Sequence, residues 1–191
     1  VLGQSYGNWE LIIQDSCSED GTEAICRSYA EKDPRIMFFR EKDEGFADAV
    51  NRAFARSKGS ILAIQSSDDQ YAHADVFRQA IDSFNNNPRL RLVTGGFRFE
   101  DSDLNIIAPG APENALREGF LSPDEIFTLK KFIPQSSAFF TRDAAVAAGP
   151  LRKELDMVAD TDFWLRICLT GIPGDRPALA VPKVWSHVMI H

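Results

Sequence analysis

Closely spaced carboxylates are the residues of this chain best suited to chemistry. Asp68 and Asp69 follow a short apolar run after two serines, Asp15 ends another run, and Asp160 and Asp162 begin a helical pattern. Two adjacent carboxylates repel each other unless a cation or hydrogen-bond donors lie beside them. Mg²⁺ and Mn²⁺ take oxygen ligands and are commonly shared between one or two carboxylates and substrate phosphates. The pattern indicates a cation-assisted phosphate site, with a solvated turn or helix cap as the alternative for each acid taken alone.

Two further pairs of residues have a spacing that suits a ligand. Asp48 and Asn51 lie three apart on the polar face of an expected helix, so both side chains can point at one ligand. The alternative for this pair is a solvated helix face. His187 and His191 lie on or near the last expected strand, and either could complete a metal or diphosphate site. A surface or core role is the alternative for each histidine.

The elements that must position these residues alternate between strand and helix. Such alternation implies crossover connections and a doubly wound, mostly parallel sheet flanked by helices. Ligands of such sheets bind outside the carboxyl ends of the strands, which is where Asp15, Asp68 and Asp69 are expected. The expected strands are 10–14, 36–40, 61–65, 90–94, 97–99, 137–141 and 184–190, and the expected helices are 22–32, 46–57, 76–84, 125–131, 142–148 and 160–170.

Composition excludes several classes of protein. The 191 residues include 21 Lys and Arg against 28 Asp and Glu, which gives a formal net charge of −7. This acidic balance argues against a general nucleic-acid binder, because phosphate contacts need clustered basic residues. No apolar run approaches the roughly 20 residues that a membrane-spanning helix needs. Three cysteines without close pairing argue against a disulfide framework or a zinc site.

Several segments, in their order along the chain, resemble inverting family 2 glycosyltransferases, which have the Rossmann-like GT-A fold of the nucleotide-diphosphosugar transferases. The resemblance covers nearly the whole chain. It implies a donor-binding half, 1–94, and an acceptor-binding half, 95–191, of one domain. The segments are 9–15 (WELIIQD), 18–22 (SEDGT), 43–51 (DEGFADAVN), 59–64 (GSILAI), 66–69 (SSDD), 133–142 (IPQSSAFFTR) and 160–166 (DTDFWLR).

The resemblance implies roles for individual residues on the donor side. Asp15 is expected to contact the nucleobase of the donor and Asp68 its ribose, with Asp48 and Asn51 also on the donor. Asp69 corresponds to the metal-binding end of the family's DxD-type motif, here Ser-Asp-Asp. The family's late histidine near the metal and diphosphate is expected to be His191, with His187 as the other choice.

On the acceptor side, the resemblance makes Asp160 the catalytic base, although Ala159 stands where the family often has Glu. Gln135 and Trp164 fall where the acceptor pocket is expected. The family also begins with a strand and helix that this chain does not show, since 1–5 (VLGQS) resembles the end of that helix. A central strand cannot be dropped without unpairing its neighbours, so we expect residues before Val1.

The expected activity is metal-dependent transfer of a sugar, with inversion, from a nucleoside-diphosphate sugar to a hydroxyl acceptor. A UDP-sugar is the favoured donor, Mn²⁺ or Mg²⁺ the cofactor, and a saccharide or lipid-linked saccharide the acceptor, in polysaccharide or glycoconjugate synthesis. The expected location is cytoplasmic, with peripheral association with the inner face of the membrane left open. The open alternatives are a non-catalytic module that binds nucleotide sugars or glycans and a metal-dependent nucleotidyltransferase or phosphatase.

Overall fold

The computed structural model describes residues 1–189 apart from 102, 104, 109–118, 128–132 and 172–176. Helices and strands alternate in its first half, as the sequence predicts. Up to α3 the elements are β1 (Leu11–Asp15), α1 (Thr22–Lys32), β2 (Ile36–Arg40), α2 (Phe46–Arg56), β3 (Ile61–Ala63), β4 (Gln70–Tyr71) and α3 (Val76–Asn86). The remaining ones are β5 (Leu92–Glu100), β6 (Ile106–Ala108), β7 (Gly119–Leu121), α5 (Pro123–Phe127), η1 (Gln135–Ser137), β8 (Ala138–Thr141), α6 (Arg142–Ala148), η2 (Lys153–Val158), α7 (Ala159–Leu169) and β9 (Ala178–Met189).

The central sheet is mixed rather than mostly parallel. It has seven strands, with β3, β8, β5, β9 and β4 side by side in that order, β6 paired with β5 and β7 paired with β9. Strands β5 and β9 pair in parallel, whereas the other described pairs of this sheet are antiparallel. The crossover through α3 does return β5 in the direction of β3, as expected. Strand β8 comes from the second half of the chain and enters between them in the opposite direction.

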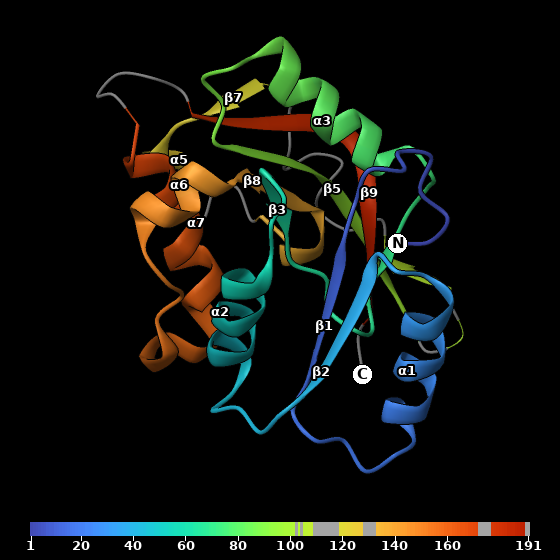
Figure 1. Ribbon diagram of the computed structural model, residues 1–191. Coiled ribbons are helices and arrows are strands. Elements are labelled where there is room, and N and C mark those ends of the chain that lie inside the picture. The colour runs from blue at the N-terminus through green and yellow to red at the C-terminus, as the bar shows by residue number, and fades with distance from the viewer. Residues whose placement is uncertain (102, 104, 109–118, 128–132, 172–176, 190–191) are drawn as a thin grey trace.

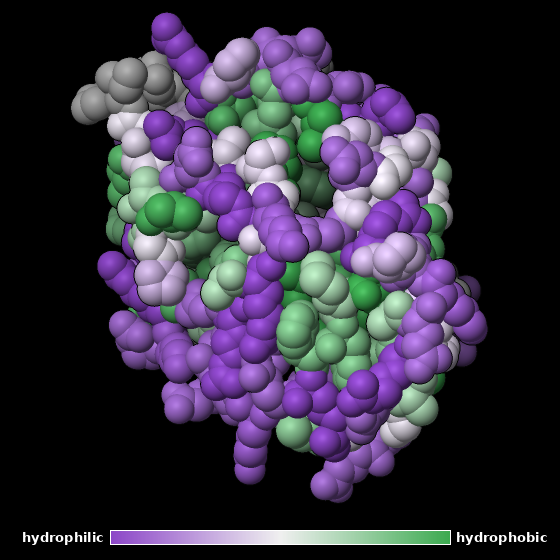
Figure 2. All heavy atoms as spheres, viewed as in Figure 1, coloured by the Kyte–Doolittle hydropathy of each residue, from purple (hydrophilic) through white to green (hydrophobic). Residues whose placement is uncertain are grey.

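Strands β1 and β2 form a separate two-stranded parallel sheet. The Glu10 carboxylate accepts hydrogen bonds from the backbone N–H groups of Lys58 at 2.5 Å and Gly59 at 2.8 Å. These residues precede β1 and β3, so the two strands begin near each other, and both run toward the lower part of Figure 1. Apolar side chains gather over β1 and β2 inside a hydrophilic rim in Figure 2, and most residues of the two strands are half-buried.

Helices cover both faces of the larger sheet, and two hydrophobic clusters fill the space beneath them. One cluster lies under α2, α6 and α7 and includes Leu92 and Phe140. The other lies under α3 and includes Val93 and Phe139. Successive strand residues point to opposite faces, so β5 and β8 each contribute neighbouring residues to the two clusters. The first cluster joins α2 and β3 to α6 and α7, so the two expected halves share one core.

The second half of the chain departs most from the sequence-based elements. The two expected strands 90–94 and 97–99 are replaced by one strand, β5 (Leu92–Glu100), and β9 begins at Ala178, six residues before the expected start. Pro182 argues against a strand because it cannot donate a ladder hydrogen bond. The register of β9 against β5 shifts between Ala180 and Val184, so Pro182 lies at an irregularity. Of the expected helix 125–131, α5 covers the first residues, and 128–131 lie outside the described residues.

No helix among the described residues is both long and apolar enough to cross a bilayer.

Gly95 lies in the middle of β5, where Trp185 occupies the space of a side chain. A Cβ built on Gly95 would lie 2.2 Å from Cγ of Trp185, a side chain that is 0% exposed. We predict that Gly95→Ala lowers the free energy of unfolding by about 2 kcal/mol or more, since a packed core cannot admit the methyl group without strain. Urea denaturation measures the change, and Gly7→Ala, with nothing within 4 Å, is the control. Equal stability of the two variants would contradict this packing.

Candidate functional site

Asp69 belongs to the segment 64–69 that follows β3, which we call the β3 exit. Two hydrogen bonds hold its side chain in place. The Ser136 hydroxyl donates a hydrogen bond to its Oδ2, and the Met189 backbone N–H donates to its Oδ1 at 3.1 Å. Burial is the main cause that raises the pKa of Asp69, and the neighbouring Asp68 adds to it, whereas the two hydrogen bonds lower it. The segments η1 and β9, far along the chain, therefore supply the two hydrogen bonds of Asp69. These bonds do not fully offset the cost of burying its negative charge, because its pKa stays raised.

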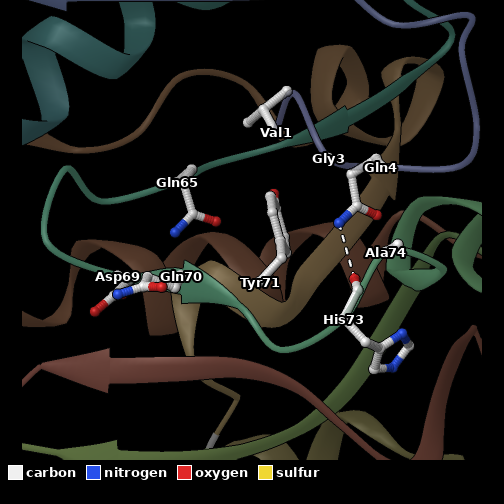
Figure 3. Close-up of a pocket in the computed structure, with 9 residues that line it drawn as sticks. All are labelled: Val1, Gly3, Gln4, Gln65, Asp69, Gln70, Tyr71, His73 and Ala74. Carbon is white, nitrogen blue, oxygen red and sulfur yellow. Dashed lines mark hydrogen bonds between the residues drawn. The ribbon is translucent and has the colours of Figure 1, made fainter. Parts of the chain in front are cut away.

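Asp69 also lines a cavity of about 340 Å³ between the first residues of the chain and β4 (Figure 3). Gln65 and Tyr71 line the same cavity. Within the described part of the chain, the buried Oε1 atom of Gln65 has no hydrogen-bond partner. A buried oxygen without a donor is costly, and a cation or a water would satisfy it.

The donor set suits a hard cation that substrate phosphates complete. Asp68 is exposed and Asp69 half-buried, and Mg²⁺ or Mn²⁺ needs only one or two such carboxylates beside phosphate oxygens. Among the described residues no three His, Cys, Asp or Glu side chains gather in a ready-made metal site. The Nδ1 atom of His187 lies 2.5 Å from Oε1 of the buried Glu100, so this side chain already has a partner within the protein. His191, the other candidate, lies outside the described residues.

Asp15 ends β1 with its side chain nearly buried. Its carboxylate accepts hydrogen bonds from the Ser18 backbone N–H at 3.1 Å and the Ser18 hydroxyl at 2.5 Å, and it lies 3.7 Å from Arg40. These contacts close the turn after β1, which agrees with the turn role weighed as an alternative. Asp15 lies at the carboxyl end of β1, and β3 runs in a similar direction in Figure 1. A donor-binding role for Asp15 stays a prediction.

Asp160 lies in the first turn of α7. Its Oδ1 accepts a hydrogen bond from the Thr161 backbone N–H at 2.6 Å. Burial raises the pKa of Asp160, against the hydrogen bonds from Thr161 that lower it. A carboxylate with a raised pKa binds a proton more readily than an exposed one, which suits a general base.

The two residues expected around the acceptor differ in position. Gln135 begins η1, and its side-chain amide donates to the Ser66 hydroxyl at 2.9 Å, so it lies beside the β3 exit. Trp164 is 1% exposed and packs against Phe140 and Phe163 in the core. The structure thus places Trp164 in the core and not on a pocket wall. It faces inward because it shares a helix face with Ile167 and Cys168.

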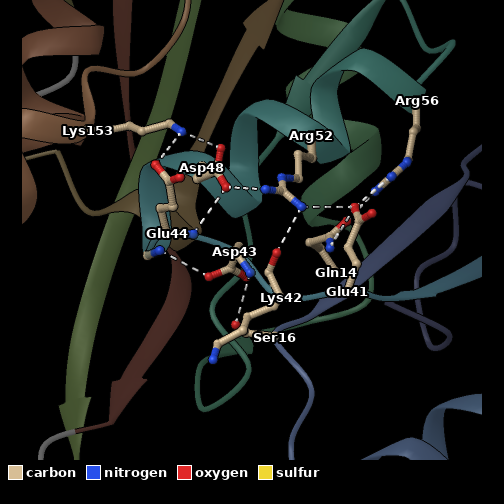
Figure 4. A network of polar contacts seen from close by, with 11 residues as sticks. Gln14, Ser16, Glu41, Lys42, Asp43, Glu44, Asp48, Arg52, Arg56 and Lys153 are labelled. Atoms are coloured by element: carbon tan, nitrogen blue, oxygen red, sulfur yellow. Dashed lines mark hydrogen bonds and ion pairs between the residues drawn. The ribbon is translucent and has the colours of Figure 1, made fainter.

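Asp48 and Asn51 lie on α2, as predicted, but their partners belong to the protein. The Asn51 side chain exchanges two hydrogen bonds with the backbone of Leu151. Asp48 pairs with Arg52 and Lys153 at 2.7 Å each (Figure 4). The donor-binding role expected for this pair stays a prediction that competes with these contacts.

Sequence reasoning did not select Ser136 or Lys153. Ser136 follows Gln135 directly, and its role depends on where the turn of η1 meets the β3 exit. Lys153 looks like any surface lysine in the sequence, and only the fold brings it to Asp48 and Glu44. A contact between residues more than a hundred positions apart leaves no local signal.

The pKa of Asp48 gives a test of its ion pairs. Lys153, then the Glu44 backbone N–H and Arg52, lower this pKa from its ordinary 3.8 to about 2. The unfolded state binds more protons between these values, so this contribution is complete above about pH 4 and is lost as the pH falls toward 2. We predict that Asp48→Asn lowers stability at pH 6 and weakens its fall between pH 5 and 3, measured by urea denaturation. The same pH slope in wild type and variant would contradict the pairing.

Comparison with known proteins agrees with this geometry. The model of the family described as Glycosyl transferase family 2 matches residues 1–147. TuaG of Bacillus subtilis, named for teichuronic acid biosynthesis, is 43% identical over 80 residues, which are 41% of this chain and 32% of TuaG. EpsE of the same organism, named as a glycosyltransferase, is 27% identical over 188 residues, which are 96% of this chain and 65% of EpsE. The chain thus spans less than two thirds of either relative.

A solved structure shows the same fold. The crystal structure of S. aureus TarS 1–349 in complex with UDP-GlcNAc superposes with a TM-score of 0.78 at 14% identity, covering 99% of this chain and 52% of TarS 1–349. This likeness confirms the GT-A fold class. The family match over residues 1–147 shows that this chain belongs to glycosyl transferase family 2.

Proposed function

We propose that this chain transfers a sugar, with inversion, from a UDP-sugar to a hydroxyl group of an acceptor. The observation that carries the proposal is the Asp69 carboxylate at the β3 exit, beside Asp68, on the wall of a cavity. Doubly wound folds bind their ligands outside the carboxyl ends of the strands, and these acids follow such an end. TarS, which shares the fold, was solved with UDP and with UDP-GlcNAc, and this favours a UDP-sugar as donor.

The residues on the donor side have distinct proposed roles. Asp69 would hold a divalent cation, Mn²⁺ or Mg²⁺, which when bound offsets the negative charge that develops on the leaving diphosphate. Asp68 would hydrogen-bond the ribose and Asp15 the nucleobase. Hydrogen bonds from the Ser136 hydroxyl and the Met189 backbone N–H hold the Asp69 carboxylate in one orientation, as donors around metal ligands commonly do.

Asp160 is the proposed catalytic base. Its carboxylate accepts the proton of the acceptor hydroxyl while the hydroxyl oxygen forms a bond to the anomeric carbon. The bond from that carbon to the diphosphate oxygen breaks, and its electron pair leaves with UDP. Attack opposite the leaving group inverts the anomeric configuration. Burial raises the pKa of Asp160, which strengthens it as a base, and general-base assistance is typically worth about 10²–10⁴-fold in rate.

The acceptor follows from the family and its relatives. We infer a saccharide or lipid-linked saccharide, since TuaG is named for teichuronic acid biosynthesis, and a role in polysaccharide or glycoconjugate synthesis. Gln135, which donates a hydrogen bond to Ser66, is the proposed contact for such an acceptor. We propose a cytoplasmic location, with peripheral contact to the inner face of the membrane where the acceptor is lipid-linked.

Replacing the proposed base separates chemistry from binding. We predict that Asp160→Asn lowers the turnover number at least about 100-fold, because the amide cannot accept the proton. Affinity for UDP with Mn²⁺, measured by calorimetry, should stay within about twofold. Wild-type turnover should also fall as the pH drops through the raised pKa of Asp160. A variant that keeps more than a tenth of wild-type turnover would remove Asp160 from this role.

Replacing the proposed metal ligand tests the donor site. We predict that Asp69→Asn abolishes the Mn²⁺-dependent part of UDP binding, because a neutral amide is a weak ligand for a hard cation. Thermal shift with a panel of nucleotide sugars and Mn²⁺, followed by mass spectrometry of products, makes the measurement. Asp82→Asn, an exposed acid of α3, is the control. Binding without any product would favour a non-catalytic module, and phosphate release without sugar transfer would favour a phosphatase.

A further inference from the structure

The segment between α6 and η2 is fastened to α2 by a paired hydrogen bond. The Asn51 amide donates through Nδ2 to the Leu151 carbonyl at 2.9 Å and accepts through Oδ1 from the Leu151 N–H at 2.8 Å. Leu151 is 2% exposed. Both ends of the Asn51 amide thus bond the backbone of one buried residue that lies a hundred positions further along the chain.

Ion pairs two residues further on reinforce this attachment (Figure 4). The Lys153 ammonium lies 2.7 Å from Asp48 Oδ1 and 3.1 Å from Glu44 Oε2. The second oxygen of Asp48 lies 2.7 Å from Arg52 and accepts the Glu44 N–H at 3.1 Å. Asp48 is itself buried, so its carboxylate depends on these donors for stabilisation.

The same segment is fastened to α7 from its other side. Arg166 donates to the carbonyls of Ala148, Gly149 and Pro150. Asp162 accepts from Arg166 at 2.8 Å and from Arg152 at 3.1 Å. Residues 148–153 therefore connect α2, in the donor half, to α7 through Asp162 and Arg166.

This connection ends at the proposed catalytic base. Residues 153–158 form η2, which packs against both α2 and α7 and continues directly into Ala159 and Asp160. Movement of 151–153 away from α2 would therefore move the start of α7. A displacement of about 1 Å at a reacting group can cost roughly 100-fold in rate.

We propose that Asp48 and Asn51 are positioning residues, which hold residues 151–153 and thereby fix Asp160 relative to the donor site. The inference rests on the proposed glycosyltransferase function. It replaces direct donor contact as the role of the two residues, because the Asn51 amide already bonds Leu151 through both its nitrogen and its oxygen, and the Asp48 carboxylate is paired with Arg52 and Lys153.

The test compares two asparagine variants. Asn51→Asp keeps the shape but loses the donor to the Leu151 carbonyl. We expect turnover to fall at least about tenfold while the Kd for UDP with Mn²⁺ stays within about twofold. Asn87→Asp is the matched control, since Asn87 also donates to a backbone carbonyl, that of Ser83, at the end of α3. A loss of UDP affinity as large as the loss of turnover would overturn the proposal, as would unchanged turnover.

A second pair of variants keeps the proposal falsifiable if Asn51→Asp does not fold. Lys153→Gln removes the charge that pairs with Asp48 and should lower turnover severalfold, whereas Lys153→Arg should restore it. In an Asp160→Asn background Lys153→Gln should change the residual rate by less than about twofold, because Lys153 acts through Asp160. Additive losses would overturn the proposal. A wild-type chain that binds UDP but transfers no sugar would overturn the proposed function and this inference together.

Discussion

The chain keeps a carboxylate partly out of water at a strand exit, and the arrangement of the site depends on this constraint. An ionised group in that position needs donors, and Asp69 receives them from Ser136 on η1 and Met189 on β9. Both bonds form only if β8 enters between β3 and β5 and β9 lies beyond β5. The mixed sheet is thus what brings residues 67 and 120 positions away to one acid.

Compensation of the charge is incomplete, since the pKa of Asp69 stays raised despite both hydrogen bonds. Asp48 is the opposite case, a buried acid with Lys153 and Arg52 beside it and a pKa of about 2. The first acid is suited to take up a cation, because one would relieve its charge. The second acid, Asp48, is already paired with the positive side chains of Arg52 and Lys153, and through Lys153 it joins α2 to η2. The pKa values of two acids of one protein thus shift in opposite directions because of their different surroundings.

Sequence predicted the local elements well and the long-range contacts poorly. Helix 22–32 and strand 36–40 came out with the predicted bounds, since caps and apolar periodicity are local. The first part of β9 was not predicted, because Pro182 argues against a strand. The strand accommodates Pro182 through a register shift against β5, which the sequence does not reveal. Trp164 looked like a pocket residue within its motif, yet its helix face packs in the core. Leu151, the partner of Asn51, and Lys153, one of the partners of Asp48, lie about a hundred residues away, and no spacing rule reaches that far.

The account stands on a cation-bridged diphosphate at the β3 exit, and a crystal structure of the chain with UDP and Mn²⁺ tests it most directly. Anomalous scattering locates Mn²⁺ without reference to the surrounding model. We predict one anomalous peak that joins an Asp69 carboxylate oxygen to the diphosphate, with Asn51 still paired to Leu151. A peak away from Asp69, or UDP bound at another face of the sheet, would contradict the account.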